Sequence, residues 1–151
     1  MAESWDPSDI PALMRAARGT YGNVIRAELI EAGYEDLPRN GPFVLGGMAN
    51  HGGSAVDMIR GLGVSRQAAS QLIDTLVLRG YFAREVNVED RRRLDITLTE
   101  RGHGAAMVVR SAVEQVHAEL ATMINPAELA GLRAGLVALA SIKEREHDVG
   151  V

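Results

Sequence analysis

The sequence predicts a mainly α-helical fold with one small β-hairpin. Three observations carry this prediction: helical periodicity over long stretches near both ends, two short helices joined by a glycine turn near the middle, and a period-two alternation soon after them. The chain has 151 residues, of which 46% are hydrophobic and 24% are charged. It is therefore long enough to bury a core, and we expect a single domain over residues 1–151.

The first helix is expected over about residues 8–33. Its apolar residues recur on one side, at Leu13, Ala17, Val24, Ile25, Leu29 and Ile30. A break with two prolines follows, and part of residues 38–50 is expected to form a second helix. Gly46 and Gly47 weigh against that helix, because each glycine costs about 1 kcal/mol relative to alanine in a helix interior.

Residues 54–79 have the pattern of a helix-turn-helix. Ser54 and Asp57 are spaced as an N-cap and its N3 partner, a turn with two glycines follows, and Ser65 caps a second helix that ends before Gly80. The predicted buried stripe of this second helix is Ala69, Leu72, Ile73 and Leu76. The opposite face is polar and carries Arg66, Gln67, Ser70, Gln71 and Asp74. Two short helices with such a turn are typical of a helix-turn-helix.

A β-hairpin is expected next, from the segments YFAREV and LDITL, the second of which alternates apolar with polar residues. Between them Arg91, Arg92 and Arg93 lie at the tip. Adjacent like charges repel one another, so this triplet needs water or an anion around it. The net charge is −4, but residues 60–101 contain eight arginines and six acids, a local +2. This local excess favours a polyanionic partner.

Two further helices are expected over residues 99–147. The first is rich in alanine, valine and methionine, and the segment NPAEL separates them, with Asn125 as an N-cap and Pro126 in the first helical position. The helices at both ends of the chain carry larger apolar faces than one small domain needs. This indicates that they pack against a second copy of the chain.

The polar face of the helix after Ser65 suits the major groove of DNA, because Arg and Gln pair with base edges and Ser bonds to phosphates. Arginines at the hairpin tip suit the backbone or the adjacent minor groove. Asp90 is expected to hold the guanidinium of Arg92. Asp95, on the returning strand, would place an acid near the DNA. The predicted contacts with double-stranded DNA are Ser65, Arg66, Gln67, Ser70, Gln71, Arg91, Arg92 and Arg93.

The segment VSRQAASQLIDTLVLRGYFAREVNVEDRRRLDITLTERG resembles the recognition helix and wing of the MarR family of winged helix-turn-helix regulators. The wing of that family has an Asp, any residue, an Arg, and a strand ending in Leu-Thr. Asp90, Arg92 and Leu98-Thr99 match it without a gap, and Thr99 to Gly102 match the family's LT-x-x-G. By this resemblance Arg92 is the minor-groove arginine and Asp90 is its orienting partner.

The resemblance also implies an architecture and a partner. It places the winged helix at about residues 37–99 and the dimerisation helices at about residues 8–33 and 99–147, in a two-fold homodimer on a pseudo-palindromic operator. MarR-type regulators often respond to small phenolic or other aromatic ligands between these parts. Residues that could line such a pocket are Tyr21, Phe43, Met48 and His51, although places in an ordinary core explain them as well.

Other functional classes are disfavoured. The chain has no phosphate loop, nucleophile elbow or paired-carboxylate motif, so we expect no enzyme activity and no cofactor. Its four histidines do not have the spacing of metal ligands, and it has no cysteine for disulfides or thiolate sites. No run of 18 apolar residues and no signal peptide is evident. We therefore expect no membrane span and a cytoplasmic location.

We therefore expect a cytoplasmic, homodimeric, sequence-specific DNA-binding transcriptional regulator, most simply a ligand-responsive repressor. The alternative is a winged helix that serves as a protein-interaction or small-ligand-binding module without operator binding. Asp95 and the net charge of −4 support the alternative. Salt-dependent affinity for DNA separates the two, because only a DNA-binding protein displaces counterions from phosphates.

Overall fold

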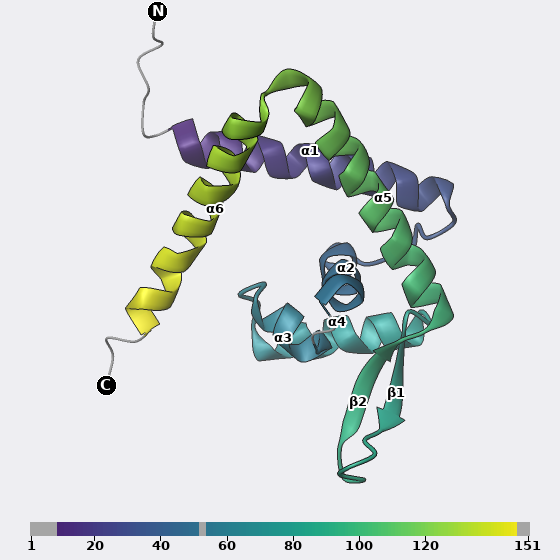
Figure 1. Cartoon of the computed structure of the whole chain (residues 1–151). Coiled ribbons are helices and arrows are strands. Elements are labelled where there is room, and N and C mark those ends of the chain that lie inside the picture. Colours follow the sequence, from purple (N-terminus) through teal and green to yellow (C-terminus); the bar gives the residue numbers. More distant parts are fainter. Residues whose placement is uncertain (1–8, 52–53, 148–151) are drawn as a thin grey trace, which may run out of the picture. The chain divides into compact units, whose positions relative to one another are not determined.

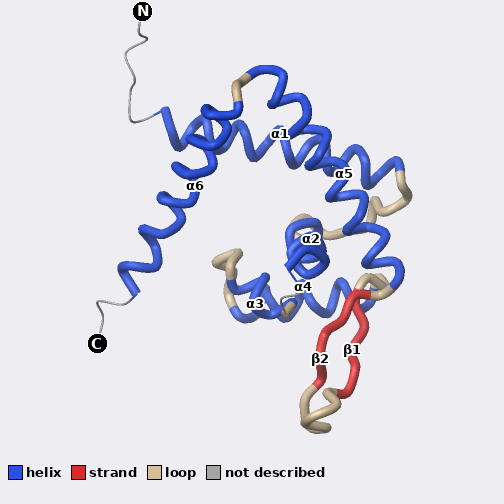
Figure 2. The backbone as a smooth tube through the Cα atoms, in the orientation of Figure 1, coloured by secondary structure: helices blue, strands red, loops and turns tan. Residues whose placement is uncertain are grey.

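The computed structural model describes residues 9–51 and 54–147 (Figure 1). Helices make up most of the described part, and one antiparallel hairpin accompanies them (Figure 2). In chain order the elements are α1 (Asp9–Glu31), α2 (Gly41–His51), α3 (Ala55–Arg60), α4 (Arg66–Leu78), β1 (Phe82–Val86), β2 (Leu94–Leu98), α5 (Glu100–Met123) and α6 (Pro126–His147). The predicted mainly α-helical fold with a small hairpin is confirmed.

The described residues form two compact units that meet within α5. The first, within residues 9–113, holds α1 to α4, the hairpin and the first part of α5. The second, from residue 114 onward, holds the rest of α5 and α6. One continuous helix belongs to both units, so a single domain over residues 1–151 stays a prediction.

The core of the first unit forms around residues from all its helices and from the base of the hairpin. Its largest fully buried side chains are Val44, Leu45, Ile59, Leu76, Tyr81 and Phe82. The predicted stripe of α4 faces this core: Leu76 is fully buried, and Ala69, Leu72 and Ile73 pack against the cluster. Burying a side chain of this size stabilises the fold by about 1.5–3 kcal/mol, so the stripe fixes which face of α4 remains outside.

Glycine in α2 permits close packing against α3. A Cβ atom on Gly47 would lie 2.5 Å from the Sδ atom of Met58, well inside van der Waals contact. Gly47 therefore has a packing reason that offsets its low helix propensity, whereas a Cβ on Gly46 would make only an ordinary contact with Val109 at 3.6 Å.

Both ends of α4 are closed by well-defined caps. At its start, the Ser65 hydroxyl accepts a hydrogen bond from the Ala68 N–H (3.2 Å). At its end, Gly80 adopts a φ of +76°, and the Tyr81 N–H donates to the Leu76 carbonyl at 2.9 Å. This is a Schellman motif, in which glycine takes the left-handed conformation without steric cost. The motif turns the chain at once into β1.

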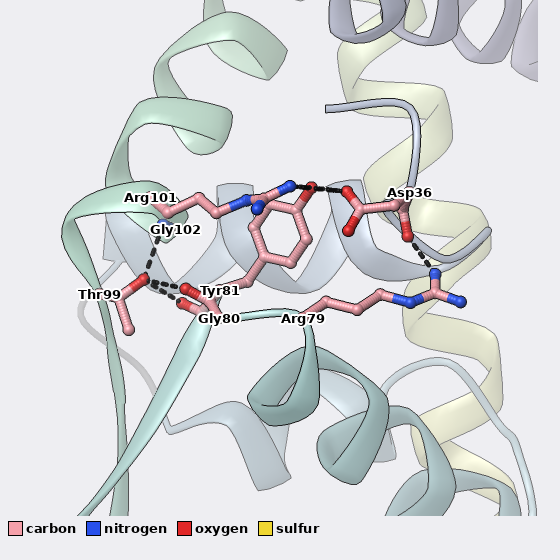
Figure 3. Close-up of polar contacts among 7 residues, drawn as sticks. All are labelled: Asp36, Arg79, Gly80, Tyr81, Thr99, Arg101 and Gly102. Carbon is pink, nitrogen blue, oxygen red and sulfur yellow. Dashed lines mark hydrogen bonds and ion pairs between the residues drawn. The ribbon is translucent and has the colours of Figure 1, made fainter. Parts of the chain in front are cut away.

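The hairpin is anchored to the start of α5 at its base. β1 and β2 pair antiparallel with Phe82 opposite Leu98. Just after β2, the Thr99 N–H donates to the Tyr81 carbonyl at 3.1 Å, and the Thr99 hydroxyl lies 2.6 Å from the Gly80 carbonyl (Figure 3). The same hydroxyl accepts from the Gly102 N–H at 3.0 Å. One threonine thus joins the end of α4, the hairpin and the first turn of α5.

In the second unit, α6 begins with a complete capping box. The Asn125 side chain accepts from the Glu128 N–H (3.0 Å), while the Glu128 carboxylate accepts from the Asn125 N–H (2.8 Å). This confirms the predicted start of the helix at Pro126. The large apolar side chains of α6 recur at helical spacing and are nevertheless exposed. They are Leu129, Leu132, Leu136, Val137, Leu139 and Ile142.

We expect Gly102→Ala to destabilise the protein by about 1–3 kcal/mol, since overpacking at a rigid site has a cost of this size. The new Cβ would lie 2.2 Å from the Tyr81 carbonyl oxygen, which the hairpin base holds in place. The free energy of unfolding from urea denaturation, at one fixed protein concentration, measures the effect.

Gly104→Ala, two residues further along α5, is the matched control. Its Cβ would meet the tip of the Tyr34 side chain, which can move aside. A loss of stability at Gly104 as large as that at Gly102 would contradict the predicted clash with fixed backbone.

Candidate nucleic-acid interface

The outward face of α4 is polar and available. Ser65 and the four side chains Arg66, Gln67, Ser70 and Gln71 are all exposed, as predicted. Within the described residues, those four side chains form no hydrogen bond or ion pair with another residue. The capped N-terminus of α4 adds backbone N–H groups and the positive end of the helix dipole, which favour a phosphate.

The loop of the hairpin is organised by Asn87, a residue that the sequence analysis did not single out. Its side-chain oxygen accepts from the N–H groups of Glu89 and Asp90, both at 2.8 Å. Its amide nitrogen donates to the Asp95 carboxylate at 2.7 Å, and its own N–H donates to the Arg93 carbonyl at 3.0 Å. Asn followed by polar residues after a strand is a recognised turn signal, and it was present in the sequence.

Two of the four acids of the wing (residues 82–98), Asp90 and Asp95, are occupied by internal contacts. Asp90 does contact Arg92, but its carboxylate accepts from the Arg92 backbone N–H at 3.0 Å, whereas the expected partner was the guanidinium. The position of the Arg92 guanidinium is therefore not set by Asp90 directly. Asp95 is half-buried and bonded to Asn87, which weakens the objection that it would confront DNA as a free acid.

Arg91, Arg92 and Arg93 are exposed at the tip of the hairpin. Across residues 9–51 and 54–147, no carboxylate lies within ion-pair distance of these three guanidinium groups. Their backbone is held by the loop, while their charged ends remain unneutralised. Such a group of cations is suited to an anionic partner, and a guanidinium can bond a phosphate through two N–H groups.

An ion pair joins α4 to the wing. Arg84 of β1 donates to the Asp74 carboxylate on the outward side of α4, and both side chains are largely exposed. An exposed pair of this kind contributes only about 0–1 kcal/mol to stability. It also neutralises Asp74, the acid on the polar face of α4.

Behind α4, a polar junction surrounds Asp36 in the connection between α1 and α2 (Figure 3). The Tyr81 hydroxyl and the Arg101 guanidinium both donate to its carboxylate, the latter at 2.9 Å, and Arg79 donates to its backbone carbonyl. The Arg101 guanidinium also lies 4.6 Å from the centre of the Tyr81 ring, a cation–π distance. The sequence analysis missed this junction, because its members are separated by up to 65 positions.

The junction shifts the pKa values of Asp36 and Tyr81 in opposite directions, and the hydrogen bond with Tyr81 raises the pKa of Arg101. The hydrogen bond from Tyr81, with the charge of Arg101, lowers the pKa of the Asp36 carboxyl below its ordinary 3.8. Burial, with the hydrogen bond to Asp36, raises the pKa of Tyr81 above its ordinary 10.0. Both shifts favour the pairing of a neutral phenol with an ionised carboxylate at neutral pH.

The residues suggested for a ligand pocket lie on α1 and α2. Phe43 is 54% exposed, and Met48 packs against the core. Tyr21 is half-buried, and the His51 side chain lies outside the described residues. The structure does show an open groove elsewhere, between α3 and β2, with Val56, Arg60, Arg93 and Leu94 in its lining. A pocket at the suggested residues stays a prediction.

Metal-binding clusters and membrane-spanning helices are both absent from the described residues. No group of three or more His, Asp or Glu side chains there is arranged to hold a metal ion. No helix in that part is both long enough and apolar enough to cross a bilayer.

The fold is shared with solved structures of low sequence identity. Streptococcus pneumoniae FabT in complex with DNA matches with a TM-score of 0.76 and 16% identity, over 93% of this chain and 99% of that chain. The S. aureus MepR–DNA complex matches with a TM-score of 0.69 and 20% identity, over 91% of this chain and 98% of that chain. E. coli MarR in its apo form matches with a TM-score of 0.62 and 22% identity, over 91% of this chain and 98% of that chain. No protein-family model matches the sequence, and no curated protein is significantly similar to it. The predicted winged helix-turn-helix fold of MarR type is thereby confirmed.

We expect the stability that Asp36 contributes to be lost in acid. Its pKa is depressed in the folded state, so its contribution is complete above the ordinary value of 3.8 and disappears as the pH falls through the folded value. The difference in unfolding free energy between the wild type and Asp36→Asn should therefore shrink from pH 6 to pH 2. Urea denaturation at several pH values measures it.

Glu35→Gln removes the same charge one position earlier and serves as the control. If the difference in unfolding free energy between the wild type and Asp36→Asn stayed constant over this pH range, an ionised carboxylate would not be what stabilises the junction.

Proposed function

We propose that this protein is a sequence-specific DNA-binding transcriptional regulator that binds a pseudo-palindromic operator as a homodimer. The observation that carries the proposal is a combination of two features. The Arg66, Gln67, Ser70 and Gln71 side chains of α4 and the three arginines at the wing tip are exposed and have no side-chain partner among the described residues. Neither feature alone would suffice, because exposed polar helices and solvated charge runs are common. Both occur together on the recognition helix and the wing, to which the resemblance to MarR-type regulators assigns DNA reading.

In this proposal α4 enters the major groove of DNA. The groove is about 12 Å wide and admits one α-helix. Arg66, Gln67 and Gln71 carry the donors and acceptors that distinguish base edges, and Ser65 and Ser70 are suited to phosphate oxygens. The wing reaches the neighbouring minor groove with Arg92, where a narrow groove concentrates negative potential.

The solved structures support DNA as the partner. FabT and MepR, which share this fold over nearly their whole length, were each solved in complex with DNA. MepR was also solved with ethidium bromide, a flat aromatic cation. This supports the further proposal that a small aromatic effector controls DNA binding, most simply by releasing a repressor. The effector would exert this control by binding one conformational state of the dimer in preference to the other. The proposal also implies a cytoplasmic location.

The homodimer is supported by the exposed apolar face of α6. Leu129, Leu132, Leu136 and Leu139 follow one another at intervals of three, four and three residues, which places them on one side of the helix. On α1, Leu13 and Met14 are likewise exposed. A second copy of the chain would bury these stripes and would set two α4 helices about 34 Å apart, one turn of DNA.

The direct test is a binding titration at several salt concentrations. The probes are a duplex recovered from a random pool by the protein itself and a scrambled duplex of the same composition. The proposal predicts a clear preference for the recovered duplex and a log–log salt slope of about −0.9 for each phosphate contacted. Equal, weak binding to both duplexes would favour the protein-interaction or ligand-binding module instead.

Two substitutions should separate the wing from α4. We expect Arg92→Ala to weaken binding about equally on all sequences and to reduce the salt slope by about 1, because its partners are backbone and groove. We expect Gln71→Ala to relax base preference at one position in each half-site, at a cost of about 1–3 kcal/mol. Repeating the duplex selection with each variant measures both. Unchanged affinity in Arg92→Ala would remove the wing from the mechanism.

Leu136→Glu should convert the dimer to a monomer at micromolar concentration, because a buried unpaired carboxylate is costly in an interface. Ala134→Glu introduces the same charge on the opposite side of α6 and is the matched control. Sedimentation equilibrium gives the mass of both variants. A dimeric Leu136→Glu protein would mean that this stripe is not the interface.

A further inference from the structure

Asp36 collects hydrogen bonds from three separate elements of the first unit (Figure 3). Arg79, the C-cap of α4, donates to its carbonyl. The Tyr81 hydroxyl, just before β1, and Arg101, in the first turn of α5, both donate to its carboxylate. The connection between α1 and α2 thereby holds the far end of α4 and the near end of α5 together.

The apolar and polar parts of this junction have different consequences. The Tyr81 ring is fully buried in the core, and its centre lies 6.2 Å from that of Tyr34, so the ring contributes to folding whatever its hydroxyl does. The Asp36 and Arg101 side chains are each more than 40% exposed, so their ion pair adds little to stability. The polar groups instead fix the relative orientation of the elements, since each hydrogen bond restricts the angle between two of them.

The orientation of α4 determines where its N-terminal end lies. The helix has 13 residues and is therefore about 20 Å long. A tilt of about 5° at its C-terminal end would displace its N-terminal end by about 2 Å, which is enough to break hydrogen bonds of about 3 Å to base edges. The residues at that end are Ser65, Arg66 and Gln67, which belong to the proposed DNA-reading face.

We propose that Asp36 is a positioning residue for DNA reading: by holding Arg79, Tyr81 and Arg101 together, it sets the angle at which α4 meets the base pairs. This inference rests on the proposed function. It assigns a role in DNA recognition to a residue outside the proposed DNA-reading face of α4.

The proposal makes a prediction of opposite sign to simple electrostatics. Removing an acid from a protein of net charge −4 should strengthen its binding to DNA of any sequence. A positioning role predicts that Asp36→Asn instead weakens binding to the preferred sequence, while binding to unrelated DNA stays the same or increases. Glu35→Gln, one position earlier, removes the same charge and provides the matched control.

The experiment measures the affinity of each full-length variant for the duplex selected by the wild type and for the scrambled duplex. We expect the ratio of the two affinities to fall about tenfold in Asp36→Asn, the scale of one lost base contact, and to stay unchanged in Glu35→Gln. Tyr81→Phe keeps the buried ring and removes one bond to Asp36, so its ratio should fall in the same direction by less. If Asp36→Asn does not fold, Tyr81→Phe decides alone.

Three results would overturn the inference in distinguishable ways. A ratio in Asp36→Asn equal to that in Glu35→Gln would remove the positioning role and leave the proposed function standing. Equal losses on both duplexes, with a matching loss of unfolding free energy, would show a structural role only. A wild-type protein without any sequence preference would overturn the proposed function and this inference together.

Discussion

The burial of Tyr81 directly after a glycine turn is the constraint on which the placement of α4 and the wing depends. The Schellman motif at Gly80 ends α4 and delivers the Tyr81 ring into the core, where it is fully buried. The Tyr81 carbonyl accepts from the Thr99 N–H, which fixes the base of the wing, and its hydroxyl bonds to Asp36. One residue thus relates α4, the hairpin, α5 and the connection after α1. The requirement for glycine at position 102 follows from the same crowding around that carbonyl.

The distribution of charge explains how a protein of net charge −4 can present a cluster of three arginines at the tip of the wing. Three acids of α4 and the wing are engaged by neighbours: Asp74 by Arg84, Asp90 by the Arg92 backbone and Asp95 by Asn87. Two others, Glu85 and Glu89, are exposed on the wing. The three arginines at the tip have no such partner among the described residues. Local pairing, more than net charge, determines the field that a nearby phosphate experiences.

Much of the fold could be predicted because it depends on local sequence patterns. The buried stripe of α4, the Ser65 cap, the Gly80 stop and the alternation in β2 each depend on residues within one element. The Asp36 junction could not be predicted in this way, because it joins positions 36, 79, 81 and 101, which become neighbours only when the chain folds. The predicted contact of Asp90 with the Arg92 guanidinium is wrong, because a short acidic side chain in a tight loop readily bonds the nearby backbone N–H.

Mapping the DNA contact on the protein itself tests the central claim most directly. Amide chemical shifts of the isotope-labelled protein would be followed while the selected duplex is added. The account predicts that the largest changes occur at residues 65–71 of the outward α4 face and at residues 87–93 of the wing, and that the buried positions of α4 change less. Changes concentrated elsewhere in the chain, with these two segments unaffected, would contradict it.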